Sequence, residues 1–210
     1  MKKQLRNAIL LVAGCIELSS CNRDPKPEFI SIASQSLRDA VDLKAGSYYI
    51  FRDSASGNLD SFYASSNSTK TVAHWGYDNT DNEQIYYDLY GPSSSPNSHI
   101  GITTNRSWVG VAFSGDQSIS GLVMFDPFQV GMNVHWVGDE GTYATAVNYY
   151  HTLTVEGFQH QDVYELESYD TNAPTQRMRT WFSSKTGLIK YRYEVAGFKA
   201  AATLVRFDVE

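Results

Sequence analysis

The strongest constraint on the fold is a two-residue period near the C-terminus. From Ile189 to Val195 an apolar side chain occupies every second position, with Lys, Arg and Glu between them, and Val205 to Glu210 repeats the pattern. Because successive side chains of a strand point to opposite faces, this alternation is typical of antiparallel strands with one buried and one solvated face. Residues 160–210 are therefore predicted to form a four-stranded meander, with turns near 172–174, 184–187 and 196–197.

Charged residues support the pairing of the first two of these strands. Glu165 and Glu167 lie on one predicted strand, and Arg177 and Arg179 lie on the next. Opposite charges that face each other across a ladder favour the pairing, each by roughly a few tenths of a kcal/mol. We therefore expect these carboxylates and guanidinium groups to meet across the ladder.

The upstream residues continue the strand pattern after one short helical segment. Apolar residues from Ile30 to Val41 recur near helical spacing, which predicts a helix over 30–41. Ser47–Arg52 and Leu59–Ala64 then flank a polar turn and predict a β-hairpin. Further alternating segments follow between residues 85 and 155, with no helical segment between strands, so a parallel sheet is not expected.

These patterns predict an all-β fold over residues 30–210, in a single domain long enough to have its own core. We expect one strongly curved antiparallel sheet, shaped like a half-barrel or an open barrel, that ends in the meander. A β-sandwich is the alternative architecture.

The first 21 residues have the layout of a bacterial export signal. Three basic residues precede an unbroken apolar run over 8–13, and Leu18-Ser19-Ser20-Cys21 resembles a lipobox, in which the chain is cut before a cysteine that is then acylated. A membrane-spanning helix is excluded by length, because spanning needs about 20 apolar residues. The chain is therefore predicted to be a lipoprotein with a palmitate-type anchor.

Two cysteines compete for the lipidated position. Cutting before Cys15 would leave an apolar core of only about seven residues, at the lower limit for a signal peptide. Cys21 gives a longer core and is followed by a polar tether that contains two prolines. We therefore assign residues 1–20 to the signal peptide, Cys21 to lipidation and residues 21–29 to the tether.

Net charge and cysteine content exclude several classes of function. The chain has a net charge of −6 and becomes more acidic once the basic leader is removed. An acidic surface argues against nucleic acid and against electrostatic binding to anionic lipid. The chain has two cysteines and only Cys21 remains in the mature protein, so a disulfide, a cysteine-based metal site and a cysteine nucleophile are excluded.

The motifs of common enzymes are absent from the sequence. There is no Gly-x-Ser-x-Gly elbow, His-Glu-x-x-His pair or Gly-x-x-x-x-Gly-Lys loop. Asp78, Asp81 and Glu83 form an acidic cluster, but their spacing lacks the alternating oxygen ligands and turn glycine of a calcium loop. We therefore predict no metal, no cofactor and no catalytic activity.

The segment Asp126–Gly141 is the best candidate for a binding site. It is the longest stretch without clean alternation, and it combines glycine and proline with aromatic residues. Long loops on a rigid scaffold are where binding residues usually lie. Trp136 is the preferred ligand-stacking residue, with His135 and Tyr143 beside it.

Three classes of function remain open. The abundance of tyrosine and tryptophan favours a binding module for a glycan, a lipid or a peptide, because such rings stack on sugars and acyl chains alike. The alternatives are an accessory subunit of an outer-membrane complex, whose exposed rings contact a partner protein, and a hydrolase with two carboxylates hidden in the fold.

The chain resembles uncharacterised outer-membrane lipoproteins of the Bacteroidota. The resemblance rests on the lipobox, on the strand 46–53 that runs into Asp60-Ser61-Phe62-Tyr63, and on Trp181-Phe182-Ser183 with Gly187–Tyr191. It implies a lipid-anchored position on the outer membrane, facing the periplasm or the cell surface. The closing meander is also similar to the half-barrel of periplasmic lipoprotein carriers, which implies a hydrophobic concavity.

The predicted anchor can be tested by substitution. Cys21→Ala removes the acylated thiol, so the protein should move from the detergent-soluble membrane fraction into the soluble periplasm when cell fractions are probed with an antibody. Cys15→Ala should leave the protein in the membrane fraction. Release by Cys15→Ala alone would show that the cut site lies before Cys15.

Overall fold

The computed structural model describes residues 29–74, 80–91, 97–104, 107–115, 119–135, 142–170, 172–173 and 175–209. Within these ranges the chain forms one sheet and one short helix, which confirms the predicted all-β class. The elements are β1 (Phe29–Ser31), α2 (Gln35–Asp39), β2 (Tyr48–Asp53), β3 (Leu59–Ala64), β4 (Thr69–His74), β5 (Thr80–Tyr90), β6 (Asn97–Thr104), β7 (Trp108–Gly115), β8 (Ile119–Phe125), β9 (Asn133–His135), β10 (Thr142–Val155), β11 (Phe158–Asp170), β12 (Arg177–Ser183), β13 (Gly187–Val195) and β14 (Phe198–Asp208).

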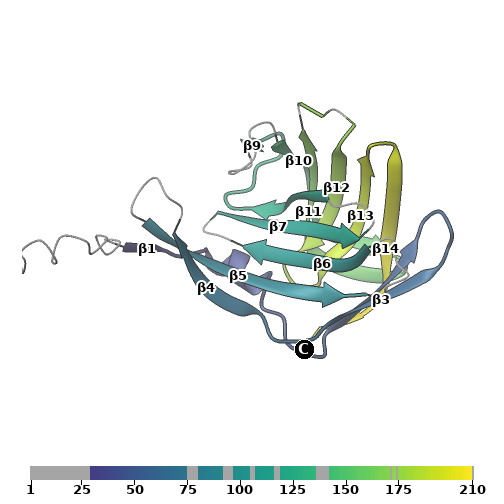
Figure 1. Ribbon diagram of the computed structural model, residues 1–210, viewed down its shortest axis with the longest axis horizontal. Coiled ribbons are helices and arrows are strands. Elements are labelled where there is room, and N and C mark those ends of the chain that lie inside the picture. The colour runs from purple at the N-terminus through teal and green to yellow at the C-terminus, as the bar shows by residue number, and fades with distance from the viewer. Residues whose placement is uncertain are drawn as a thin grey trace, which may run out of the picture.

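The strands follow one continuous path. Its order is β8-β7-β6-β5-β3-β2-β14-β13-β12-β11-β10-β9, and β1 and β4 pair with β5 off this path. In Figure 1, β5–β7 run across the view and β10–β14 run steeply to them. The sheet therefore curls into the predicted half-barrel, and the two separate sheets of a sandwich do not form.

The predicted hairpin and meander are both present. β2 and β3 pair antiparallel, with Tyr48 opposite Tyr63, and β11 to β14 are joined in order by antiparallel ladders. Glu167 lies directly opposite Arg179, as the charges predict. The guanidinium of Arg179 turns to the neighbouring carboxylate, with its Nε 2.7 Å from Glu165 Oε1.

The helix predicted over 30–41 is wrong in extent. α2 covers only Gln35–Asp39, and the residues before Ile32 form β1, which pairs parallel with β5. The hydrogen-bonding groups at the start of β5 pair with this segment, and this tertiary contact overrides the helical spacing. Leu37 and Val41 are nevertheless buried in the core, so the apolar spacing of this segment reflects burial of its side chains and not a longer helix. The sheet is antiparallel, as predicted, and the short β1–β5 ladder is parallel.

The alternation predicted for the last strand is interrupted by a β-bulge. Leu204 is buried, Arg206 is exposed and Phe207 packs against the core, but the register shifts between Leu204 and Arg206. Val205 is the inserted residue, so its predicted place in the buried row is wrong. Such an insertion changes which side chains face the core, and a pattern of period two does not predict it.

The concave side of the sheet is filled by the protein's own side chains. Aromatic rings from four strands pack in series, with Phe51 5.9 Å from Phe62 and 5.7 Å from Tyr191, and Tyr191 4.5 Å from Phe113, measured between ring centroids. Ring pairs at such distances stabilise a core beyond simple area burial. The interior is therefore a packed core, and the hydrophobic concavity implied by the lipoprotein carriers is occupied.

The curl closes where β8 crosses β11 and β12. Gly121 permits the approach, because a Cβ at this position would lie 2.7 Å from Ser168 Oγ and would collide with the end of Met178. The next residue is bonded from both sides: the Leu122 amide donates to Ser168 Oγ at 3.0 Å, and Thr180 Oγ1 donates to the Leu122 carbonyl at 3.4 Å. Side chains of β11 and β12 thus satisfy backbone groups of a terminal strand.

The tip of the β10–β11 hairpin closes another part of the barrel. Arg52 of β2 forms an ion pair with Glu156 at 2.8 Å, and Phe207 of β14 packs against Phe158 and His160. Strands that are separated along the sheet are thereby brought together.

A buried carboxylate joins α2 to the sheet. Glu83 of β5 is almost fully buried and forms ion pairs with Arg38 of α2, at 2.8 Å, and with Lys70 of β4. It also accepts a hydrogen bond from the Ala33 amide at 3.2 Å. Burial alone would raise the pKa of Glu83, but the hydrogen bonds from Lys70 and Ala33 and the charge of Arg38 outweigh burial and lower it. Glu83 therefore belongs to an ion-paired structural cluster; Asp78 lies outside the described residues.

Among the described residues, none lies in a helix with the length and apolar character that a membrane crossing needs.

The alternation in β13 predicts a contrast between two neighbours. Ile189 is fully buried, so Ile189→Asp should reduce the free energy of unfolding by several kcal/mol, because it places an unpaired charge in the core. Lys190 is half-exposed, with its ammonium 4.9 Å from the centre of the Trp181 ring, so Lys190→Asp should lose only about 1 kcal/mol. Urea denaturation of both variants measures the difference, and equal losses would contradict the alternation.

The Glu83 cluster predicts acid sensitivity. The folded pKa of Glu83 is lowered, so its contribution to stability is present at neutral pH and is lost as pH falls through that folded pKa. Glu83→Gln should be less stable than the wild type at pH 7, and the gap should shrink towards pH 3. Thermal melts across this range measure the gap. Burial lowers the pKa of His160, so protonation of His160 also destabilises the fold in acid. This loss is the same in both proteins and cancels in the comparison. A gap that does not change with pH would contradict the role of the charge.

Candidate functional site

The segment predicted to bear the site leaves the end of β8 and packs back onto β10. Asp126 follows β8 directly, and backbone hydrogen bonds join Gly131 and Met132 to Ala146 of β10 at 2.8 and 2.9 Å. The described part of the segment ends at His135 in the short strand β9. The loop therefore forms a wall beside the long β10–β11 hairpin.

A surface pocket of about 410 Å³ lies between this loop, the hairpin and α2. We call it the aromatic pocket; it is lined by Ser36, Met124, Phe125, Asp126, Phe128, Val130, Tyr149 and Tyr164. Its volume is in the range of small-ligand sites, which is roughly 300–1,000 Å³. Val130 is 54% exposed and Tyr149 is 40% exposed, so apolar surface remains accessible at its mouth.

Four aromatic rings form the body of this pocket. The Phe128 ring lies 5.2 Å from Phe125, 5.0 Å from Tyr164 and 6.4 Å from Tyr149, and the two tyrosine rings are 5.3 Å apart, all measured between centroids. Rings at these separations and tilts hold one another in place. The pocket is thus largely preformed, with Tyr149 as its most exposed ring.

A β-bulge in β10 places Tyr149 beside Tyr164. The register shifts between Ala146 and Asn148, so that Tyr149 stands directly opposite Tyr164. In a regular ladder continued from Ala146, Asn148 would stand opposite Tyr164. Bulges are often found where a strand must redirect a side chain towards a site.

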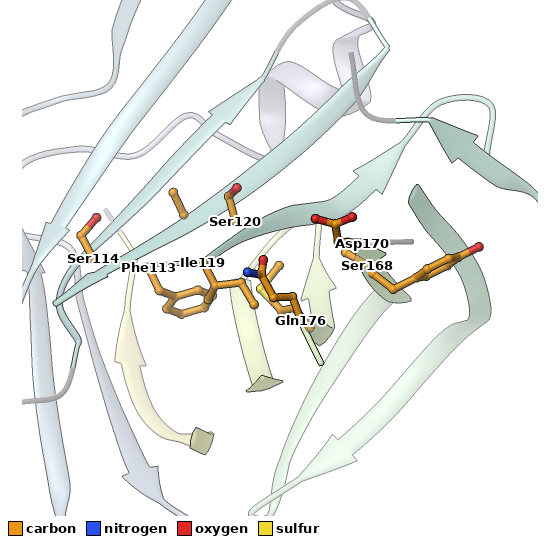
Figure 2. Close-up of a pocket in the computed structure, with 10 residues that line it drawn as sticks. Phe113, Ser114, Ile119, Ser120, Ser168, Asp170 and Gln176 are labelled. Carbon is orange, nitrogen blue, oxygen red and sulfur yellow. The ribbon is translucent and has the colours of Figure 1, made fainter. Parts of the chain in front are cut away.

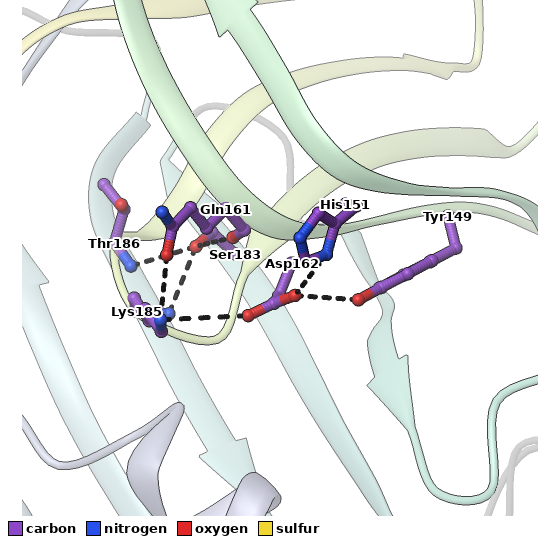
Figure 3. A network of polar contacts seen from close by, with 7 residues as sticks. All are labelled: Tyr149, His151, Gln161, Asp162, Ser183, Lys185 and Thr186. Atoms are coloured by element: carbon purple, nitrogen blue, oxygen red, sulfur yellow. Dashed lines mark hydrogen bonds and ion pairs between the residues drawn. The ribbon is translucent and has the colours of Figure 1, made fainter.

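A polar network borders the aromatic pocket at Tyr149. Figure 3 shows the carboxylate of Asp162 between the Tyr149 phenol, the His151 imidazole and the Lys185 ammonium. The Tyr149 hydroxyl donates to Asp162 Oδ1 at 2.7 Å, His151 Nδ1 lies 3.6 Å from the same oxygen, and Lys185 Nζ lies 3.9 Å from Oδ2. The side chains of His151 and Lys185 are 90% and 64% exposed, so they can hydrogen-bond to a bound molecule.

The backbone of Asp162 is held in an unusual conformation. Its φ of +51° lies in the left-handed region, which aspartate tolerates better than most residues but which is uncommon inside a strand. The adjacent turn helps to fix it, because Lys185 Nζ also donates to the Gln161 side chain at 2.9 Å. Residues held in sparsely populated backbone regions cluster at functional sites.

The two tyrosines of the pocket are hydrogen-bond donors at neutral pH. The hydrogen bond to Asp162, followed by burial, raises the pKa of Tyr149 to about 12. Burial, together with the nearby charges of Asp162 and Asp126, also raises the pKa of Tyr164. Both phenols therefore stay neutral, and the pocket presents uncharged rings beside an anionic carboxylate.

A second pocket of about 290 Å³ lies where the β7–β8 hairpin meets the ends of β11 and β12. Figure 2 shows Ser114 at one end and Asp170 at the other, with Gln176 and Ile119 between them. The hydroxyl of Ser168 in its wall already accepts the Leu122 amide. Part of its polar lining therefore holds β8 in place, which favours a structural role.

The structure describes the predicted ligand-binding and lipidation residues only in part. Trp136 lies outside the described residues, as does Cys21. His135 is described through its backbone, which pairs with Tyr143 of β10. The Tyr143 ring stacks on Tyr169 with centroids 6.0 Å apart and lines neither pocket.

Sequence reasoning missed the rings that form the aromatic pocket. Phe128 and Val130 belong to the predicted segment, but the tyrosines come from the hairpin that follows it. The signal for Tyr149 was the adjacent Tyr149-Tyr150 pair. Which of the two faces the loop depends on the β10 bulge, which the sequence pattern does not reveal.

The described residues bring together no group of three or more His, Cys, Asp or Glu side chains that could hold a metal ion. The two most buried carboxylates of the described residues, Glu83 and Glu165, both have ion-pair partners. Glu83 is held by Arg38 and Lys70, and Glu165 by Arg179 and the Tyr150 hydroxyl.

Comparisons with known proteins find similarity in structure but not in sequence. No family model matches the chain, and no curated protein matches it. Among solved structures, the crystal structure of "a putative lipoprotein" from Parabacteroides distasonis is similar with a TM-score of 0.40 and 8% sequence identity, over 80% of this chain and 98% of that chain. At this level of similarity the neighbour adds nothing to the geometry of the site.

Proposed function

We propose that the chain is a lipid-anchored envelope protein whose domain binds a ligand instead of catalysing a reaction, and that the aromatic pocket binds a neutral carbohydrate. The observation that carries this proposal is the exposed Tyr149 ring, set between an aromatic pocket and an exposed polar network. The anchor is the one predicted at Cys21, on the outer membrane.

The chemistry of a sugar ring fits both parts of this site. The C–H face of a pyranose packs on an aromatic ring, while its hydroxyl groups point outward and need hydrogen-bond partners. Tyr149 supplies the ring surface, and the carboxylate of Asp162 accepts hydrogen bonds from hydroxyl groups. Lys185 and His151 supply donors at the same edge.

A long acyl chain fits this site less well. The concave side of the sheet, where a lipid carrier would hold such a chain, is packed with the protein's own rings. The aromatic pocket is an open surface pocket of about 410 Å³ beside charged groups. Burial of an extended apolar chain next to Asp162 would desolvate its carboxylate without a new partner.

The test is a binding screen followed by titration of matched variants. An array of neutral and acidic oligosaccharides identifies the best carbohydrate, and calorimetry then measures its Kd. Tyr149→Ala should weaken binding about three- to tenfold, because a stacking ring contributes roughly 0.5–1.5 kcal/mol. Asp162→Asn should also weaken binding, through loss of the charged acceptor.

The matched control is Tyr63→Ala. Tyr63 is 55% exposed on β3 and lines none of the pockets described above, so its removal should leave Kd unchanged. Equal effects of Tyr149→Ala and Tyr63→Ala would contradict the site. In a parallel screen of fatty acids and peptides, tighter binding of one of these than of every carbohydrate would contradict the ligand class.

A further inference from the structure

The outer face of the meander contains a second, chemically different groove. Its volume is about 500 Å³, and it lies over β12, β13 and β14 with the turn after β2 as one wall. We call it the arginine groove; its charged lining residues are Glu167, Arg177, Arg179, Arg192, Glu194 and Lys199. Its charged lining residues lie on the solvated face of the sheet, and the core residues Met178 and Tyr193 also border it.

Cations are concentrated on this face despite the acidity of the chain. Arg177 and Arg179 of β12, Arg192 of β13 and Lys199 of β14 all line the groove, whereas the chain as a whole has a net charge of −6. Lys190 lies on the same face, two residues before Arg192. A local positive field on a negative protein attracts anions to one place.

Ion pairs within the groove leave Arg192 unmatched. Glu165 neutralises Arg179, with 2.7 Å between Oε1 and Nε, and Glu194 neutralises Lys199, with 3.1 Å between Oε2 and Nζ. Arg192 is exposed and has no ion-pair or hydrogen-bond partner among the residues that the structure describes.

The cross-strand neighbours of Arg192 add to this imbalance. Arg192 stands directly opposite Arg179 on one side, and like charges in that position are unfavourable. On the other side it stands opposite Ala201, whose small side chain leaves room above the sheet. The guanidinium thus borders an open space of ligand size, and no described carboxylate lies within ion-pair distance of it.

We infer that the arginine groove binds an oxyanion, namely the carboxylate, sulfate or phosphate group of an acidic ligand, with Arg192 as its principal contact. The planar guanidinium presents paired N–H donors that match two oxygens of such a group. Arg177, on the neighbouring strand and in the same groove, adds positive charge at the same end. This site is separate from the aromatic pocket and does not depend on the function proposed there.

The experiment compares one arginine in the groove with one outside it. Arg192→Gln removes the unmatched charge, and Arg206→Gln makes the same change at an exposed residue of β14 whose guanidinium lies 5.8 Å from the Tyr48 ring and does not line the groove. Trigalacturonate, a heparin tetrasaccharide and inorganic phosphate serve as carboxylate, sulfate and phosphate probes, and maltotriose is the neutral control. Calorimetry at low and physiological salt measures each Kd, and a thermal melt confirms that both variants are folded.

Binding of at least one anionic probe should weaken about tenfold in Arg192→Gln and less than twofold in Arg206→Gln, whereas the response to maltotriose should be the same in the wild type and both variants. Tyr149→Ala should leave the anion affinity unchanged, which separates this result from the carbohydrate proposal. Which probe binds best identifies the anionic group. Equal losses in the two arginine variants would show a general charge effect and overturn the site, as would the absence of binding by all three anions at millimolar concentration.

Discussion

The architecture depends on the contact between β8 and the β11–β12 pair. β8 is a terminal strand of the path, so one of its edges has no ladder partner. Ser168 and Thr180 satisfy the backbone of Leu122 instead, and Gly121 allows the walls to approach. Terminal strands with free backbone groups are prone to pair with other chains, so this contact both completes the core and blocks an exposed edge.

The aromatic pocket arises from two local departures from regular β geometry. The bulge after Ala146 turns Tyr149 towards Tyr164, and the left-handed backbone of Asp162 holds its carboxylate against the Tyr149 hydroxyl. A regular ladder would place Asn148 opposite Tyr164. The irregular part of the longest hairpin is thus also the part with exposed polar groups.

The period-two pattern predicted the meander, the hairpin and the buried row of β13 correctly, because side-chain alternation and burial have the same physical origin. It failed where a tertiary contact or an inserted residue decided the outcome. The first residues of the expected helix form β1 because they pair with β5. Val205 is the extra residue of a β-bulge and therefore does not belong to the buried row. The loop that begins at Asp126 lines the aromatic pocket, but the tyrosines opposite it come from β10 and β11, and the sequence pattern does not show that the fold brings them to this loop.

The short helix α2 sets where the aromatic pocket lies relative to the start of the domain. Ser36 lines this pocket and donates to Asp126 at 3.4 Å, while Arg38 is fixed to β5 through Glu83. If Cys21 carries a lipid, the chain from it to Phe29 can extend to at most about 30 Å. A domain on so short a tether samples only a thin layer above the bilayer, so the pocket can meet only molecules that are themselves bound to the membrane surface or that diffuse into this layer.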